Sequence, residues 1–378
     1  MFRLRLSLVA VVVAVSVSVV AAAFASTAAQ SPLLIAVEGP QSGDQASNGR
    51  DQLRGVRLAV AQLNAAGGLW DGRKVSIFAA DDQGAKKFAK PAARSVIAKG
   101  IHFVIGPYNS SVGLANLSLY RAKRVLPIWL TSDDATGGVG ATVQPMNSQV
   151  APVEERYARS LGAKSVAMLV DDTANGAFTK GMATRLRAAL EGNGTSVEWI
   201  SLEEGQPADY YAEKVATAVA RQPDLLYVST YFPEGVQVAK ALAAAGSQAK
   251  CLMGLANVDD GFVAATTLAE AQQCLFSGVP AAPEIPSARA YVRQYRSMFH
   301  QTPGVWGTFT YDSARLLFAA INRAKSYDFA AVERAVRQTK GFEGATGSIT
   351  VDAKTGYRVA APVDILQVSA AKKFVIVK

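Results

Sequence analysis

The chain has 378 residues, half of them hydrophobic, and it carries 39 Lys and Arg against 30 Asp and Glu. This length exceeds what one ordinary hydrophobic core holds, so it predicts two domains. The net charge of +9 is spread along the sequence without the basic clusters and interleaved aromatics of a nucleic-acid-binding surface, which argues against a nucleic-acid partner.

The N-terminus has the pattern of a secretory signal peptide. Arg3 and Arg5 precede an apolar run over residues 6–24, and small residues offer cleavage sites after Ala25 and Ala29. No cysteine lies nearby to accept a lipid. We expect residues 1–29 to be a signal peptide and the mature protein to be periplasmic. The alternative is an uncleaved anchor, since the run is just long enough to span a bilayer.

From residue 32 onward, short apolar runs alternate with helical patterns, which is typical of a parallel sheet covered by helices. The first helix ends at Gly67-Gly68, as a glycine C-cap predicts. Pro91 is expected in the first turn of its helix, because further inside it would remove a hydrogen bond. Strands are predicted over 33–37, 75–80, 102–105 and 125–130.

A second α/β series begins near residue 150. Its helices are predicted over 153–161, 177–190, 212–221, 235–245 and 262–269, and its strands over 165–170, 196–200, 225–229, 251–253 and 275–277. Three more helices follow a Pro-rich crossover and are assigned back to the first domain, over 288–299, 310–324 and 329–339. The chain ends in a predicted hairpin, 347–352 with 357–359, and strands over 363–368 and 374–377.

The predicted fold class is α/β, with two doubly wound lobes joined by a hinge of several crossovers. Residues 30–149 and 280–342 would form lobe 1, and residues 150–279 and 343–378 lobe 2. Ligands of such sheets bind at the carboxyl ends of the strands. Two facing lobes therefore enclose a cleft lined by strand-to-helix loops.

The order of several short motifs resembles that of type I periplasmic solute-binding proteins, in particular the branched-chain amino acid group. These motifs are Ser42-Gly43, Ala66-Gly67-Gly68, Asp81-Asp82 and Ile105-Gly106-Pro107. The resemblance covers essentially the whole mature chain. It implies the substrate-binding component of an ABC importer, which binds a small polar solute, passes it to a membrane permease, and has neither a cofactor nor enzymatic activity.

The resemblance places the ligand carboxylate at the loop after the third strand. The matching residues are Tyr108, Asn109, Ser110 and Ser111, which immediately precede or begin a helix. Free N–H groups at a helix N-terminus favour an anion, so the physical reading agrees. In the alternative interpretation, Ser110 or Ser111 only caps the helix.

The loop after the fourth strand is the second predicted contact region. It reads Thr131, Ser132, Asp133 and Asp134 where the family offers small residues and a Thr, and two carboxylates there would repel a ligand carboxylate. The resemblance suggests further contacts from Asn48, Asn175, Tyr231 and Asn257.

The solute class stays open at this point. Where the family usually has an acid for the ligand ammonium, the chain has Leu255-Ala256-Asn257. Three classes remain: an amino acid or close derivative, an amide, urea or other neutral polar solute, and an aromatic or other organic acid. A ligand-sensing receptor or regulator with the same fold is the competing function.

Other reactive residues give weaker signals. Cys251 and Cys274 are an even pair in an exported chain, which favours a disulfide over two buried thiols. The paired aspartates precede helices, where Asp is a good cap, and the two histidines have no second ligand nearby, so no metal site is predicted. Among the four tryptophans, Trp129 is the best candidate for the cleft because it ends a strand.

Overall fold

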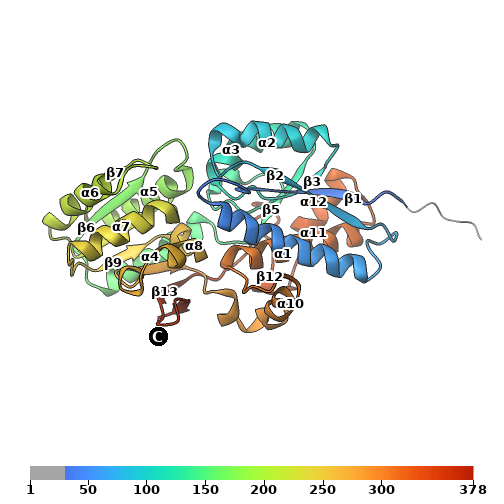
Figure 1. Ribbon diagram of the computed structural model, residues 1–378. Coiled ribbons are helices and arrows are strands. Elements are labelled where there is room, and N and C mark those ends of the chain that lie inside the picture. Colours follow the sequence, from blue (N-terminus) through green and yellow to red (C-terminus); the bar gives the residue numbers. More distant parts are fainter. Residues whose placement is uncertain (1–29, 378) are drawn as a thin grey trace, which may run out of the picture. The chain divides into compact units, whose positions relative to one another are not determined.

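Two sheets organise the computed structural model, which describes residues 30–377 (Figure 1). The sheet of the first lobe is parallel throughout and has the strand order β2-β1-β3-β4-β5. Its central strands are buried on both faces, which explains their continuous apolar sequences. The strands are β1 (Leu33–Gly39), β2 (Val75–Asp81), β3 (Phe103–Ile105), β4 (Leu126–Trp129) and β5 (Ala141–Thr142).

The second lobe is built on a larger sheet with the order β14-β13-β10-β9-β8-β6-β7. The run from β10 to β7 is parallel, and β13 and β14 join antiparallel at one edge. The strands are β6 (Ser165–Asp171), β7 (Ser196–Leu202), β8 (Leu225–Ser229), β9 (Cys251–Met253), β10 (Leu275–Gly278), β13 (Asp364–Val368) and β14 (Phe374–Ile376).

The helices of the first lobe come from both ends of the chain. In Figure 1, α11 in orange-red lies alongside α1 in blue. Asp51 of α1 accepts hydrogen bonds from Gly304 N and Gly307 N at the start of α11. The helices are α1 (Ala46–Ala65), α2 (Lys86–Ala98), α3 (Ser110–Ala122), α10 (Arg289–Phe299), α11 (Val305–Ala324) and α12 (Phe329–Arg337).

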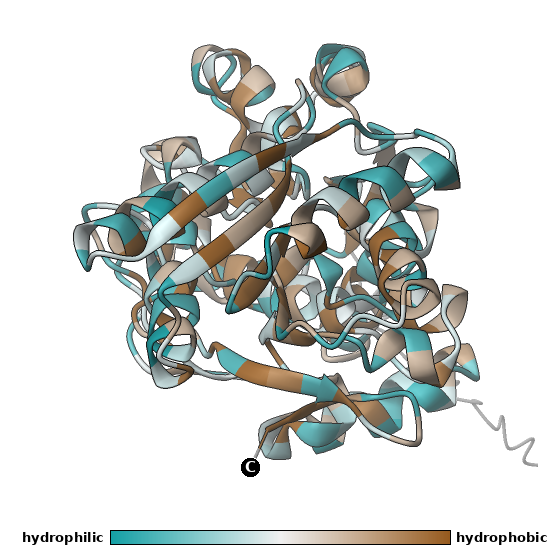
Figure 2. Ribbon diagram, turned by 90° about the vertical axis from the view of Figure 1, so that its left-hand side faces the viewer, coloured by the Kyte–Doolittle hydropathy of each residue, from teal (hydrophilic) through white to brown (hydrophobic). Residues whose placement is uncertain are grey.

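The helices of the second lobe follow its parallel strands in chain order. Strands and helices on the side viewed in Figure 2 carry alternating brown and teal bands, as expected for elements with one apolar and one polar face. The helices are α4 (Asn147–Ser160), α5 (Ala177–Gly192), α6 (Ala208–Ala220), α7 (Phe232–Ala244), α8 (Asp260–Ala265) and α9 (Leu268–Ala271).

The chain crosses between the lobes three times: after β5, after β10 and before β13. The hairpin of β11 (Phe342–Gly344) and β12 (Gly347–Ile349) lies on the first lobe, where its turn donates two backbone N–H bonds to Asp312 of α11. Tyr357 also bridges to Thr142 of the first sheet. The crossing therefore falls near residue 360, whereas the sequence analysis placed it at 343.

Two local expectations were wrong, and a third was confirmed in part. Pro91 lies inside α2, which begins at Lys86, and not in the first turn. The helix predicted to begin at residue 153 is α4, which begins at Asn147 and also contains a proline. A proline near the start of a helix removes only one intrahelical hydrogen bond, so the turn before it still forms. The predicted hairpin is confirmed in its second half: residues 350–352 pair antiparallel with 357–359 through the bridge between Val351 and Arg358 and two flanking backbone hydrogen bonds, whereas β12 pairs with β11.

The expected signal peptide, residues 1–29, lies outside the described residues. Within residues 30–377, no helix has the length and apolar character needed to cross a membrane.

Candidate functional site

A small cavity lies between the lobes at the carboxyl ends of strands from both sheets. Its walls come from the segments after β3, β4 and β5 of the first lobe, the segments after β6, β8 and β9 of the second, and the first turn of α11. In this closed arrangement the cavity volume is about 10 Å³, and all the space between the lining atoms, open solvent included, is about 230 Å³. The lining residues are Tyr108, Ser110, Leu130, Ser132, Gln144, Phe178, Tyr231, Leu255, Ala256 and Trp306.

The N-terminus of α3 forms the polar end of the cavity. Asn109 is the N-cap residue, but its side chain makes no cap hydrogen bond and donates to Gln45 instead, at 3.1 Å. Ser110 and Ser111 lie inside the first turn, both buried. Capping therefore does not explain these two serines. The uncapped helix end is a suitable site for an anionic oxygen.

Tyr231 of the second lobe reaches this helix end. Its hydroxyl lies near the Asn109 side chain and the Ser110 backbone N–H, and both groups lower its pKa. Burial raises the pKa of Tyr231, and these two donors only partly offset the rise. A neutral phenol oxygen from one lobe thus interacts with the helix terminus of the other, where a ligand oxygen would be favoured.

Aromatic rings form most of the remaining wall. The Tyr108 ring centroid lies 5.5 Å from that of Trp306 and 6.3 Å from that of Tyr231, and Phe178 lies 6.0 Å from Tyr231. These separations are typical of packed aromatic rings, and the pair of Tyr108 and Tyr231 meets edge to face. Within the part of the chain that the structure describes, the buried indole Nε1 of Trp306 has no hydrogen-bond partner.

Trp306, and not Trp129, is the tryptophan of the cavity. Trp129 lies in the core of the first lobe, and its Nε1 donates to Val139 O at 2.7 Å. Trp129 was predicted for the cleft because it ends a strand. Its indole instead points away from the strand end and packs against Tyr120 of α3.

Ser132 and Gln144 add a polar pair opposite the rings. Gln144 Nε2 donates to Ser132 Oγ at 2.8 Å and also to Leu130 O. Gln144 Oε1 finds no partner among residues 30–377. Because Ser132 Oγ already accepts a hydrogen bond, its proton is available to a ligand.

The two aspartates of this loop do not line the cavity. Asp133 caps the 3₁₀ turn η1 (Asp134–Thr136) by accepting from Ala135 N at 2.8 Å, and its own N–H donates to Ser110 Oγ. Asp134 pairs with Arg185 of α5 at 2.9 Å and accepts from Ser148. Asp133 therefore supports the loop, and Asp134 bridges the lobes. The predicted ligand contact of these two residues is not seen in this arrangement.

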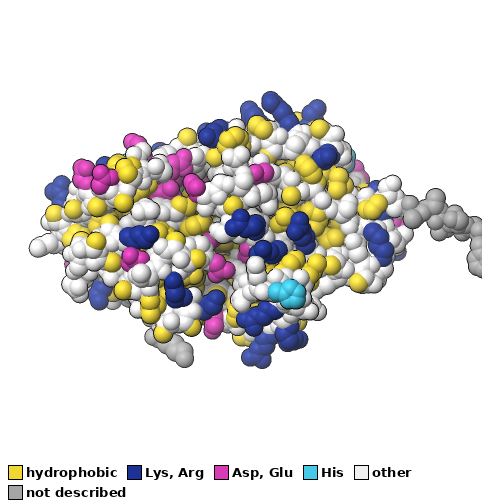
Figure 3. Space-filling model, viewed as in Figure 1, with side chains coloured by type: hydrophobic (Ala, Val, Ile, Leu, Met, Phe, Trp, Pro, Cys, Tyr) yellow, Lys and Arg dark blue, Asp and Glu magenta, His cyan; other side chains and the backbone are white. Residues whose placement is uncertain are grey.

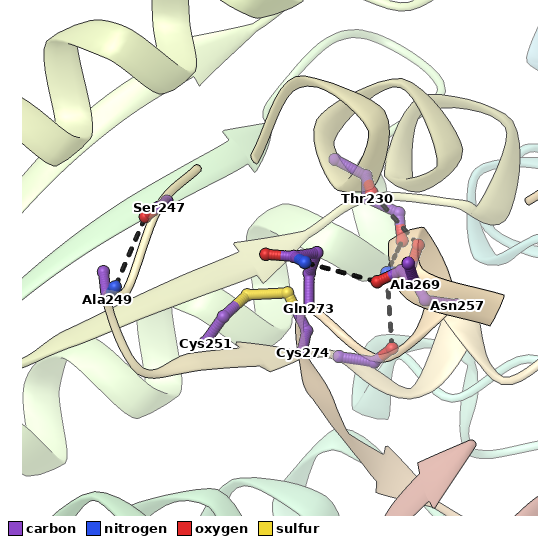
Figure 4. Close-up of a disulfide and its surroundings, with 9 residues drawn as sticks. Thr230, Ser247, Ala249, Cys251, Asn257, Ala269, Gln273 and Cys274 are labelled. Carbon is purple, nitrogen blue, oxygen red and sulfur yellow. Dashed lines mark hydrogen bonds between the residues drawn. A yellow bond between two sulfur atoms is a disulfide. The ribbon is translucent and has the colours of Figure 1, made fainter. Parts of the chain in front are cut away.

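Thr131 and Asn257 also lie outside the lining of the cavity. Thr131 is buried and its hydroxyl lies 2.6 Å from that of Thr136. Figure 4 shows Asn257 facing Thr230 within the second lobe, where Asn257 Nδ2 donates to Thr230 O at 3.0 Å and Asn257 Oδ1 accepts from Thr230 Oγ1 at 3.4 Å. Asn257 is fully buried behind Leu255 and Ala256, so its predicted ligand contact is not found in this arrangement.

Asn48 and Asn175 flank the cavity. Asn48 is buried beside the Tyr108 hydroxyl and lines a neighbouring hollow with Asp51, Asp259 and Asp260. Asn175 Oδ1 accepts from Lys86 N at 2.9 Å, and this contact joins the lobes at a wider opening.

That opening has opposite charges on its two sides. Lys86 and Lys87 of the first lobe face Glu204 and Glu234 of the second. Burial raises the pKa of Glu234 to about 7. In Figure 3, acidic side chains gather at the upper left, over the part of the second lobe that contains β7 and α6, while Lys and Arg gather over α2.

A disulfide joins Cys251 of β9 to Cys274, the residue before β10 (Figure 4). It therefore ties neighbouring strands of the second sheet, away from the cavity. Over the described stretch, the structure has no group of three or more His, Cys, Asp or Glu side chains able to hold a metal ion.

Comparison with known proteins gives an independent result. Residues 32–373 match the sequence profile of the family described as "Periplasmic binding protein". The "Leu/Ile/Val-binding protein homolog 3" of Brucella melitensis is 29% identical over 344 residues, which is 87% of this chain and 90% of that protein.

Solved structures show the same fold. A leucine-binding protein of Thermotoga maritima superposes with a TM-score of 0.81 at 21% identity, covering 91% of this chain and 97% of that chain. A solute-binding protein of an ABC transporter from Rhodopseudomonas palustris, solved with 3,4-dihydroxybenzoic acid, gives a TM-score of 0.79 at 20% identity, covering 91% and 95%. With the profile match over nearly the whole described chain, these comparisons establish that the protein belongs to the periplasmic binding protein family.

Proposed function

We propose that this protein is the extracytoplasmic solute-binding component of an ABC importer. The observation that carries the proposal is the cavity between two lobes, with an uncapped helix terminus at one end and apolar rings around it. The family match and the similarity to a Leu/Ile/Val-binding protein homolog support a small polar solute such as an amino acid, its derivative or an amide. The charged and apolar pattern of residues 1–29 supports export to the periplasm.

Binding needs no covalent step. An acceptor atom of the solute docks at the N-terminus of α3, near Ser110 and Ser111, and takes the place of the Tyr231 hydroxyl. The second lobe then closes with Phe178 and Tyr231 over the body of the solute. Closure follows only if the solute binds the closed arrangement more tightly than the open one. A binding free energy of about −8 kcal/mol suffices for scavenging and still allows release to a permease.

A thermal-shift screen of the protein lacking residues 1–29 tests this proposal. The panel contains amino acids, amides, urea, polyamines and aromatic acids. A ligand that binds only the folded protein at 100 times its Kd adds about 2.7 kcal/mol of stability and raises Tm. A rise confined to one chemical class supports solute binding, whereas an unchanged Tm across all classes contradicts it.

A further inference from the structure

The wall of the cavity is uncharged. None of the lining residues drawn from the described chain is Asp, Glu, Lys, Arg or His. Leu255 and Ala256 occupy the second-lobe side, after β9, and Leu130 lies on the first-lobe side. An ammonium group that entered this space would lose its hydration without gaining a carboxylate partner, at a cost of several kcal/mol.

The available hydrogen-bonding atoms are mainly donors. At the wall, Trp306 Nε1 is buried and lacks a partner among the described residues, and the same holds for Ser111 Oγ in the first turn of α3, next to the lining residue Ser110. Ser132 can donate its proton, and the Ser110 N–H lies near the Tyr231 hydroxyl. Gln144 Oε1 is the opposing acceptor at the wall. A carboxylate accepts hydrogen bonds only, so this set suits a carboxylate better than an ammonium.

Carboxyl groups do lie behind the tyrosines, and each is already engaged. Asp259, near Tyr108, accepts from Gly261 N, and Asp133, near Tyr231, accepts from Ala135 N. Burial raises the pKa of Asp259 to about 8, so at neutral pH it is mostly uncharged and hardly repels a bound anion.

Asp171 is the third carboxyl behind the wall. It also lies near Tyr231, and its Oδ1 accepts from Thr173. Its Oδ2 has no partner within residues 30–377, but the side chain packs against Gly176 and is not part of the cavity wall.

We infer that the solute is a monocarboxylate with an aromatic or branched apolar body and without an ammonium group. Its carboxylate lies at the start of α3, and its body lies among Tyr108, Phe178 and Trp306. This inference rests on the proposed solute-binding function, and it replaces the amino acid or amide named there by an organic acid, the third solute class of the sequence analysis.

Calorimetric titration with matched probes tests the inference. The probes are 3-phenylpropanoate, phenylalanine and 3-phenylpropanamide, together with 4-methylpentanoate, leucine and 4-methylpentanamide. We expect at least one acid to bind tenfold or more tightly than both its amino acid and its amide. An amino acid or amide that binds as tightly as its acid overturns the inference but leaves the proposed function intact.

If none of the six probes binds, the thermal-shift panel distinguishes two interpretations. If the thermal-shift panel detects another chemical class, the inference is overturned and the proposed function stands. If no compound in that panel raises Tm either, the inference and the proposed function are both overturned.

A variant that supplies the missing carboxylate gives an independent test. Ala256→Glu adds an acceptor at the wall, and Ala256→Gln adds nearly the same volume without charge. We expect the ratio of phenylalanine affinity to 3-phenylpropanoate affinity to rise tenfold or more in the Glu variant relative to the Gln variant. An unchanged ratio in folded variants overturns the inference. Ala256→Asp and Ala256→Asn provide the smaller pair if the longer side chains prevent cooperative melting.

Discussion

The two lobes face the same cavity with different chemistry. The first lobe presents backbone and hydroxyl donors at the start of α3, while the second presents Phe178, Tyr231, Leu255 and Ala256. Polar groups fix the orientation of a ligand, and apolar contact area provides much of its affinity. The first lobe is therefore suited to selecting the polar head of a solute, and the second to detecting its body.

The largest effect we predict is on stability. It concerns the buried carboxyl of Glu154 in the second lobe, and the surface carboxyl of Glu155 serves for comparison. Burial raises the pKa of Glu154 to about 7, although Ser277 and Tyr227 donate to it. The folded state therefore binds the Glu154 proton more tightly than the unfolded state does. The contribution of Glu154 to the free energy of unfolding is favourable below pH 4.5 and is lost as pH rises through 7. A shift of this size corresponds to about 3 kcal/mol.

Urea unfolding at pH 4.5 and pH 8 measures this contribution. Relative to the native protein, Glu154→Gln should gain about 3 kcal/mol between the two pH values. Glu155→Gln, the next residue on α4, which pairs with Arg159, is the control and should follow the native protein. Equal pH dependence in all three proteins would contradict the prediction.

The second prediction separates the ring of Tyr231 from its hydroxyl. Removing an aromatic anchor from a buried site costs about 2 kcal/mol or more, so Tyr231→Ala should weaken solute binding about 30-fold. Tyr231→Phe keeps the ring and removes the hydroxyl that lies near the Ser110 N–H, so it should bind at least as tightly as the native protein. Titration with the solute found in the panel decides; a Phe variant as weak as the Ala variant would show that the hydroxyl itself binds the solute.

The third prediction concerns the first lobe. Ser111→Ala removes a buried hydroxyl that has no partner within the described chain. Losing one hydrogen bond to the solute costs about 1 kcal/mol, which is a roughly fivefold weaker Kd. Ser313→Ala is a matched control, since that hydroxyl is also buried and unpartnered but lies in α11 beyond the first turn, which is the part of α11 that contributes to the cavity wall. Equal Kd values for both variants would remove Ser111 from the site.

The smallest effect is expected at the ion pair between the lobes. Arg185 and Asp134 are partly exposed, and such pairs contribute about 1 kcal/mol or less. Arg185→Ala should therefore change Kd by less than fivefold, with the difference shrinking as salt rises. A larger, salt-independent loss would show that Asp134 contacts the solute, as the sequence suggested.

The fold could be predicted from the sequence because strand and helix periodicities alternate along almost its whole length. The errors fall where local patterns are weak. The segment 343–360 is assigned to the first lobe by Asp312 and Thr142, which are distant in sequence, and no local pattern marks these contacts.

The site could be predicted only in part. Tyr108, Ser110, Ser132 and Tyr231 line the cavity as expected, because each follows a strand at its carboxyl end. The same rule points to Phe178, after β6, which was missed. Gln144 and Trp306 carry no such signal, since they follow a two-residue strand and begin a returning helix.

The contact between Tyr231 and the start of α3 makes the second lobe a competitor tethered within the molecule. A solute that docks at the helix end displaces the nearby hydroxyl, so it exchanges one set of contacts for another. Its net affinity is then the difference between the two sets, which keeps binding moderate even when every contact is good. The same exchange runs in reverse at delivery, when the hydroxyl can return to the helix end and help expel the solute toward the permease.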